Sequence, residues 1–578
     1  MRLIYTGGVW MTFLSLASAR QYCARAFHSV SINNNTLYID GGELRYYGDR
    51  SSDNPGGYVF EPMHDIQTVD LSKPWSNTDD WSNLYGTIYK PVYTESDLTR
   101  PTYLNEGASW SDGSNLYFYG GYRSLCTDCD TPETVPPVAT WKYDIAGNEW
   151  NKDGFEGTLL HRLCEGGIAK SKKYNVAYFL GGVLIAEGDP SVSQSVGRSW
   201  TGMVSGLLTL DMDAQRWSNL STLGMNNWAT ISEGYVNIIE SVGDRGILVA
   251  FGGFTYPIGL EISRLATAQN DAKNHNSMEY ILLYDIARER WYTQKSSGDI
   301  PSWRMSGCSV VVPAQDQSSF SIYVFGGMGY KTADSDGDVY VLSIPSFHWI
   351  RVNSDNKKIW IKHKCQLVAG HTLLSVGGTV PTDDSEYDPT KENCASGDFT
   401  NGLALFNLNN HTWHGNYDPS DRDEYAIHSS ITKVIGGNST GGATVIEPES
   451  KFNGTDVASM FEAARKKATV SLFPSSDPFS SSSSSASESA PESARGFSKR
   501  AIAGIVVGVI AAIAIIGTVT FYVKRHRHGP TNHKNPKHVV FRDGFGPAEL
   551  YGDQGQLGPA ELHGKHRPPE LDGEFQRV

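Results

Sequence analysis

Residues 322–327 read IYVFGG and residues 342–349 read LSIPSFHW. This pair of segments decides the fold because five other pairs in the chain follow the same pattern. Each apolar segment ends on two glycines, and together these are Gly41, Gly42, Gly120, Gly121, Gly181, Gly182, Gly252, Gly253, Gly326, Gly327, Gly377 and Gly378. Each is followed by a second strand-like segment that closes on a tryptophan, namely Trp75, Trp150, Trp217, Trp291, Trp349 and Trp413. Six such pairs in register predict six repeats of one β-sheet unit.

The pattern resembles the kelch repeat, in which each unit forms one four-stranded blade of a β-propeller. The resemblance runs from about residue 25 to residue 413. It implies that the glycine pairs leave the second strand with positive φ and that the tryptophans pack between neighbouring blades. We therefore expect an all-β kelch-type propeller over residues 20–447.

Six blades are favoured, and seven are the alternative. The segment 425–446, YAIHSSITKVIGGNSTGGATVI, has β character and one more glycine pair but lacks a closing tryptophan, so it completes the ring edge or forms a partial seventh blade. Residues 448–470 are expected to form a short helical extension, in which Met460, Phe461 and Ala464 share one face.

The two ends of the chain indicate a type I single-pass membrane protein. Residues 1–19 are apolar and end in Ala-Ser-Ala, which is typical of a signal peptide. Residues 501–523 contain no charged residue and are long enough to cross about 30 Å of hydrocarbon as a transmembrane helix. Basic residues follow the span directly, so the N-terminus is expected outside and the chain at the plasma membrane or cell surface.

The segments on either side of the span are unsuited to a core. Residues 471–500 are rich in serine and predict an extended stalk. Residues 524–578 form the predicted cytoplasmic tail and hold three P-x-E-L-x-G motifs, which either bind a cytoplasmic partner or arose by drift in a disordered repeat. No catalytic domain fits in this tail.

Glycosylation signals, cysteines and net charge agree with a secreted ectodomain. All seven cysteines precede the span, where disulfide bonds persist, and their odd number leaves at least one unpaired or paired between chains. A net charge of −14 argues against nucleic acid as a partner. Five N-x-S/T acceptors also precede the span, at Asn34, Asn219, Asn410, Asn438 and Asn453.

Long inserts mark one side of the predicted propeller. They follow the glycine pairs and cover residues 43–67, 122–139, 183–205, 254–279 and 379–399. Because each insert has the same place in its repeat, all should emerge from one rim. Loops of this length are usually functional or disordered. This rim is the expected binding surface for a glycan or protein ligand.

A ring of polar residues is expected at the channel through the propeller. Glu106, Glu165 and Glu233 precede their glycine pairs at matching places, and His28 and His363 are the predicted counterparts in the first and sixth repeats. Converging carboxylates and imidazoles could hold a divalent metal or a cationic ligand. The alternative is that they are polar groups bonded to backbone and channel water.

An enzymatic function is the alternative to binding. Galactose oxidase has a kelch-type propeller, but its copper site needs a Tyr-His dipeptide that is absent here, and its C-terminal ligand domain is replaced by the serine-rich stalk. We also find no G-x-S-x-G, H-E-x-x-H or phosphate loop. No cofactor is therefore expected.

The order of signal, propeller, stalk, span and tail resembles ascomycete kelch-repeat surface proteins. This resemblance implies a recognition, adhesion or cell-wall role. The leading hypothesis is a non-enzymatic receptor or adhesin, with a metal-dependent ectoenzyme and a structural cell-wall tether as alternatives.

Overall fold

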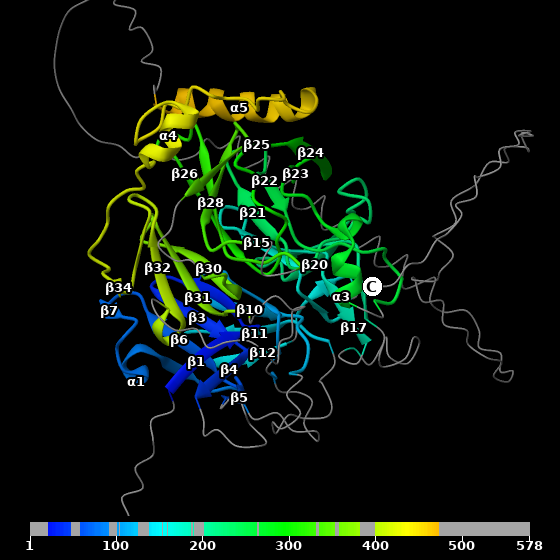
Figure 1. Cartoon of the computed structure of the whole chain (residues 1–578). Coiled ribbons are helices and arrows are strands. Elements are labelled where there is room, and N and C mark those ends of the chain that lie inside the picture. The colour runs from blue at the N-terminus through cyan, green and yellow to red at the C-terminus, as the bar shows by residue number, and fades with distance from the viewer. Residues whose placement is uncertain are drawn as a thin grey trace, which may run out of the picture. The chain divides into compact units, whose positions relative to one another are not determined.

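The computed structural model describes residues 21–47, 58–91, 101–102, 104–124, 138–152, 154–158, 160–186, 189, 201–262, 265–330, 335–352, 358–381 and 399–472. This part of the chain is mostly β-sheet with few helices (Figure 1). The predicted signal peptide (1–19), most of the predicted stalk (471–500), the predicted span (501–523) and the predicted tail (524–578) lie outside it.

Six antiparallel meanders of four strands make up the centre of the described residues, and we number them in chain order. Sheet 1 consists of β2 (Ser29–Asn33), β3 (Thr36–Asp40), β6 (Ile66–Asp70) and β8 (Gly86–Ile88). Sheet 2 consists of β9 (Ala108–Ser111), β10 (Asn115–Tyr119), β11 (Trp141–Asp144) and β12 (Glu149–Asn151). Sheet 3 consists of β15 (Gly167–Ser171), β16 (Val176–Leu180), β19 (Leu207–Asp211) and β20 (Arg216–Leu220), with β13 (Glu156–Gly157) added in parallel.

Sheets 4 to 6 repeat the same strand order. Sheet 4 consists of β21 (Tyr235–Ile239), β22 (Ile247–Phe251), β23 (Tyr280–Asp285) and β24 (Arg290–Lys295). Sheet 5 consists of β26 (Cys308–Pro313), β27 (Phe320–Phe325), β28 (Val339–Ile344) and β29 (His348–Val352), with β25 (Ser297–Gly298) added in parallel. Sheet 6 consists of β30 (Ile361–Val368), β31 (Thr372–Thr379), β32 (Leu403–Asn407) and β33 (Thr412–His414).

The first strands of neighbouring sheets lie side by side. Strand β2 packs against β9, β15 against β21, and β26 against both β21 and β30. Strand β30 also lies against β2, so the sixth sheet is next to the first. The arrangement is consistent with an all-β kelch propeller.

Paired glycines end the second strand of every sheet because a side chain has no room there. All twelve have positive φ. A Cβ added at Gly326 would overlap the His363 ring and the carbonyl oxygen of Trp360, and one at Gly377 would overlap His28. Both the backbone conformation and the close approach of the next sheet therefore require glycine.

The turns between third and fourth strands explain why an aspartate or asparagine recurs at a similar distance before the closing tryptophan of a repeat. In sheet 2 the Asp144 carboxylate accepts hydrogen bonds from the N–H groups of Ala146 and Gly147, both at 3.0 Å. Asn407 has the same role in sheet 6, where its side-chain oxygen accepts from Asn409 and Asn410. Short polar side chains fix such turns by bonding the backbone two and three residues on.

Three of the six tryptophans bridge neighbouring sheets through their indole N–H. Trp217 donates to the Thr140 hydroxyl at 2.8 Å and Trp349 donates to the Met278 carbonyl at 3.0 Å. Trp291 donates to the Ser221 carbonyl at 3.3 Å. Each partner belongs to the preceding repeat, so these side chains join one repeat to the next.

The first repeat departs from the predicted pattern at Trp75. Its strand β7 (Trp75–Ser76) does not enter sheet 1 but pairs with β34 (Asn416–Tyr417), and the Trp75 ring stacks on Tyr417 at 5.3 Å. The fourth strand of sheet 1 is β8, which follows the short helix α1 (Trp81–Leu84). Trp75 therefore contacts β34, which follows the sixth sheet in the chain, and does not close sheet 1.

Residues 425–446 do not form a seventh sheet. They contain helix α4 (Ser429–Ile435), whose Ile431 and Ile435 are buried against sheets 5 and 6. Consecutive glycines Gly436 and Gly437 have positive φ and end the helix. The alternative of a partial seventh blade in this segment is therefore wrong, because its β-like residues are used as the apolar face of a helix.

The C-terminal extension ends in helix α5 (Thr455–Leu472). Its Val457, Met460 and Phe461 are buried in the cluster formed by sheets 4 and 5, and the Phe461 ring contacts Phe347 at 5.7 Å. Figure 1 shows α4 and α5 together at the outer side of these sheets. The predicted helical extension thus packs on the sheets through the expected face.

Within the described ranges, no helix combines the length and the apolar character that a bilayer crossing needs.

Candidate functional site

Six residues, one from each repeat, occupy equivalent positions at or just before the first strand of each sheet, and we call them the ring residues. All have φ between 52° and 64°. From the second sheet on, each N–H donates to the carbonyl oxygen of the ring residue before it, at 2.7–3.2 Å. Non-glycine residues adopt this conformation only where their surroundings impose it. They are Phe27, Glu106, Glu165, Glu233, Ser306 and Lys362.

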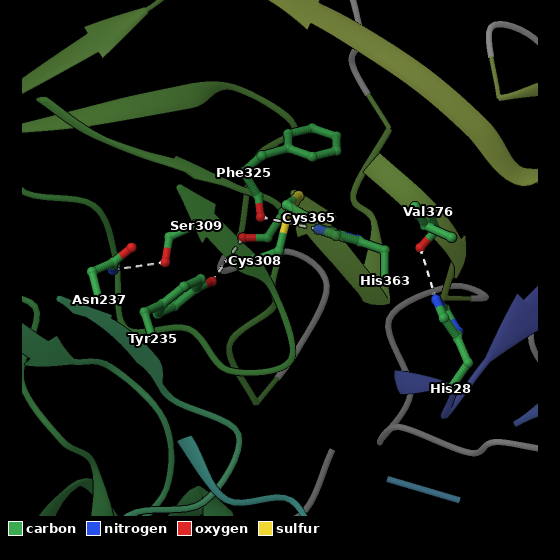
Figure 2. The surroundings of a disulfide bond; sticks show 10 residues. His28, Tyr235, Asn237, Cys308, Ser309, Phe325, His363, Cys365 and Val376 are labelled. Atoms are coloured by element: carbon green, nitrogen blue, oxygen red, sulfur yellow. Dashed lines mark hydrogen bonds between the residues drawn. A yellow bond between two sulfur atoms is a disulfide. The ribbon is translucent and has the colours of Figure 1, made fainter. Parts of the chain in front are cut away.

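The three predicted glutamates are therefore brought together, but the two predicted histidines are not ring residues. His28 and His363 each follow the ring position by one residue, and both are buried. Their Nε2 atoms lie 3.1 Å from the Val376 carbonyl and 3.2 Å from the Phe325 carbonyl (Figure 2).

These histidines pack between neighbouring sheets as neutral groups. Burial, and then the charge of Arg25, hold the pKa of His28 well below its ordinary value. Burial lowers the pKa of His363 to about 3. Each ring fills the space over a glycine pair of the adjacent sheet, which explains why a histidine stands at this place in repeats 1 and 6. They supply packing, not ligands to the ring.

Five of the six ring residues, all except Phe27, line a small pocket with a volume of about 40 Å³. It lies at the end of the sheets from which the inserts leave, since Asn105 and Ser232, next to two ring glutamates, form backbone bridges to Tyr122 and Phe254 of the inserts. Its walls are polar and carry both signs of charge. They comprise Glu106, Glu165, Gly166, Glu233, Gly234, Ser306, Gly307, Lys362 and Lys364.

Lys362 crosses this pocket and connects sheet 6 with sheets 2 and 4. Its ammonium group contacts the Glu233 carboxylate directly and lies 3.5 Å from Glu106. Lys364 reaches the other oxygen of Glu106 at 3.0 Å. Burial alone would raise the pKa of Glu106, but the charges of Lys364 and then Lys362 outweigh it and hold that pKa below its ordinary value. The hydroxyl of Ser306 donates to Glu233.

Glu165 is placed differently from the other two carboxylates. It accepts a hydrogen bond from the Ser232 hydroxyl at 3.0 Å. Burial, and then repulsion from Glu233, raise the pKa of Glu165 to about 7. A carboxyl group that titrates near neutral pH in a pocket is a candidate functional group.

The geometry does not fit the predicted metal ring. A divalent ion between the glutamates would need the place that the Lys362 ammonium takes. Among the described side chains, those close enough to share one ion are Cys308, His363 and Cys365. The two sulfur atoms of this group are joined in a disulfide bond between β26 and β30 (Figure 2). A disulfide has no thiolate to offer a metal.

The other cysteines are only partly described. Cys23 is disulfide-bonded, and Cys164 is a free, buried thiol. The predicted loop disulfide between Cys126 and Cys129, as well as Cys394, lie outside the described residues.

The described parts of the inserts contact one another above the pocket. In the first insert β4 (Glu43–Tyr47) and β5 (Tyr58–Pro62) extend β1 (Gln21–Ala26), which also pairs with β31. Glu43 accepts hydrogen bonds from Asn105 at 2.8 Å and from Ser124, in the second insert, at 2.6 Å.

The third and fourth inserts are joined in the same way. Strands β17 (Val183–Ile185) and β18 (Thr201–Met203) form a small sheet with β14 (Leu163–Cys164). The N–H of Ile262 in the fourth insert donates to the Thr201 carbonyl at 2.8 Å. Met203, Phe254 and Met305 share one apolar cluster. The described inserts thus form a continuous layer, which we call the insert face; it also carries α3 (Leu265–Asn270).

The five predicted glycosylation acceptors all lie in the described residues and are exposed. Whether any of them carries a glycan stays a prediction. They are Asn34, Asn219, Asn410, Asn438 and Asn453.

The sequence reasoning missed Lys362 and Lys364, which complete the pocket. Both flank His363 in the segment IKHK, and the alignment of the repeats places His363 at the ring position that Lys362 occupies. The sequence does contain a signal for the correct alignment. In repeats 2 to 5 the ring residue is followed by glycine, and in repeats 1 and 6 histidine stands in the place of that glycine. The residue before the histidine is therefore the ring residue.

Comparison with known proteins adds one finding. No family model matches the chain. It is 25% identical over 491 residues to a kelch repeat-containing protein of Arthroderma benhamiae, and the match covers 75% of this chain. The chain spans 65% of that relative, less than two thirds of its length. The likeness supports the interpretation of this chain as a kelch-repeat protein.

Proposed function

We propose that this chain is a non-enzymatic binding protein in which the six sheets form a six-bladed kelch propeller and the insert face recognises a protein partner. The observation that carries the proposal is the contact between inserts of four successive sheets, which builds one surface from segments that the sheets themselves do not need. The kelch-repeat relative favours a protein-interaction role.

The insert face also has an exposed apolar residue that suits a partner contact. Leu260 in the fourth insert is 54% exposed. Single exposed apolar residues are common on protein surfaces, so Leu260 supports a partner contact because it lies on the insert face.

Anchoring at the cell surface belongs to the same proposal. It rests on the predicted signal peptide, the predicted span over residues 501–523 and the exposure of the five glycosylation acceptors. In this reading the tail motifs recruit a cytoplasmic partner, and the propeller faces the cell exterior or the cell wall.

The test compares two matched substitutions in the full-length chain, purified in detergent micelles and screened on arrays of secreted proteins and of glycans. Leu260→Asp places a charge on the insert face, and Val434→Asp places one on α4, where Val434 is 36% exposed. We expect a protein ligand whose affinity falls at least about tenfold, or about 1.4 kcal/mol, with Leu260→Asp and is unchanged with Val434→Asp.

Other outcomes of the same screen contradict the proposal. A ligand that loses affinity only with Val434→Asp would place binding on the C-terminal extension. Selective binding of glycans and of no protein would replace the protein partner by a carbohydrate one.

A further inference from the structure

The ring pocket contains more acidic than basic side chains. It contains three carboxylates, on Glu106, Glu165 and Glu233, and two ammonium groups, on Lys362 and Lys364. The lysines form ion pairs with Glu106 and Glu233. Among the described residues Glu165 bonds to the Ser232 hydroxyl and forms no ion pair. One carboxylate therefore remains for an additional cation.

The pocket already shows how it accommodates a cationic side chain. The Lys362 ammonium contacts two carboxylates and stands 5.4 Å from the centre of the Phe27 ring. Ammonium and guanidinium groups are attracted both to carboxylates and to aromatic faces. Tyr122 of the second insert packs edge-on against Phe27 at 6.4 Å.

Glu165 also has the right position for a group that arrives from outside. It follows Cys164, the last residue of β14, and β14 pairs with β17 of the third insert. Glu165 therefore lies where the ring pocket meets the third insert.

We propose that Glu165 accepts the ammonium or guanidinium group of a lysine or arginine side chain that a protein partner inserts into the ring pocket. The inference rests on the proposed function, because it names the chemistry by which a partner on the insert face would be anchored.

The proposal couples binding to the release of a proton. Glu165 faces Glu233 and Glu106, whose charges disfavour its ionised form, and Lys362, whose charge favours it; the Ser232 hydroxyl also favours the ionised form. Cys164 and Tyr122 lie beside it as neutral groups whose own pKa values are raised by burial. Lys364 lies across the pocket on Glu106. An added cation lowers the pKa of Glu165, so binding near neutral pH releases protons, and binding weakens as the pH falls below 7.

The experiment uses two small probes that differ only in charge. N-acetyl-arginine methylamide carries a guanidinium group, and N-acetyl-citrulline methylamide is its neutral counterpart. Each is titrated calorimetrically into the full-length chain in detergent micelles at pH 8 and pH 6. We expect at least about tenfold tighter binding of the arginine probe at pH 8, and a smaller preference at pH 6.

Two variants assign the effect to Glu165. Glu165→Gln should remove the preference for the arginine probe. Glu240→Gln should keep it, because Glu240 bonds to Ser171 and to the Lys173 N–H at the opposite end of sheet 3. Thermal unfolding of each variant verifies that it is folded.

Equal affinity for both probes in the unaltered chain would overturn the inference, as would an arginine preference that survives Glu165→Gln. Neither result depends on a natural partner. The outcome is therefore separable from the Leu260→Asp test of the insert face, which can succeed or fail independently.

Discussion

Replacing Glu165 by glutamine should stabilise the fold in alkaline solution and leave it unchanged in acid. The ordinary pKa of this carboxyl group is 4.5, and in the fold it is about 7. Each pKa unit is worth about 1.4 kcal/mol, so the ionised carboxylate costs the folded state roughly 3 kcal/mol at pH 8 as an upper bound. Glutamine keeps the side-chain oxygen that accepts from Ser232 and removes the charge that Glu233 repels.

The sign follows from the raised pKa. Below pH 4.5 the group is protonated in both the folded and the unfolded state, so it contributes nothing to the pH dependence. Between pH 4.5 and pH 7 the unfolded chain loses the proton first, and the penalty develops. Above pH 7 it is complete.

Urea unfolding of the full-length chain in detergent, followed by tryptophan fluorescence at pH 4 and pH 8, measures this difference. The expected result is a gain of about 1 to 3 kcal/mol for Glu165→Gln at pH 8 and no gain at pH 4. Glu240→Gln is the matched control and should show no gain at either pH. A gain that is equal at both pH values would refute the reasoning, because it would come from packing and not from charge.

Three further outcomes are expected. Lys362→Met leaves the carboxylates of Glu106 and Glu233 without their shared cation. The free energy of unfolding in urea should therefore fall by about 3 to 5 kcal/mol, and calorimetry should detect Mn²⁺ binding that the unaltered chain lacks. Unchanged stability would mean that Lys362 is not their counter-ion. Replacing Cys308 and Cys365 together by serine opens a loop closed over a separation of 57 residues and should cost about 4 kcal/mol in the same assay; a loss below about 1 kcal/mol would show that the bond constrains little. Elemental analysis of the chain purified without chelator should find no stoichiometric copper, whereas one copper per chain would support the oxidase alternative.

Much of the fold follows from the sequence because its signals are local. A glycine pair specifies positive φ and a close approach of the next sheet, and Gly326 and Gly377 meet both conditions. An aspartate or asparagine before the turn bonds its own backbone, as Asp144 and Asn407 do. These constraints act within a few residues, so the chain displays them directly.

The departures occur where a distant segment decides the outcome. Trp75 has the spacing of a closing tryptophan, but Tyr417 offers it a stacking partner, so β8 takes its place in sheet 1. Residues 425–446 have the composition of a strand, but the helix α4 buries Ile431 and Ile435 against sheets 5 and 6. Neither contact leaves a sign in the local pattern.

The candidate site was only partly predictable for a related reason. Glu106, Glu165 and Glu233 share the dipeptide Glu-Gly and could be aligned by it. Repeats 1 and 6 have no such dipeptide, and a shift of one residue selected histidine in place of Phe27 and Lys362. A one-residue shift exchanges the side chain at the pocket for one that packs between sheets.

The pairing of β7 with β34 has a consequence for the time at which the protein can fold. The N–H of Asn77 donates to the Gly415 carbonyl at 2.8 Å, and the Trp75 ring lies on Tyr417, so the first sheet lacks these partners until residue 417 is synthesised. More than three hundred residues separate the two segments. At about 5 to 20 residues per second, the segment around Trp75 waits roughly 17 to 68 seconds for the segment around Tyr417. During that interval Trp75 lacks its stacking partner, and a chain released early at residue 400 would never acquire it.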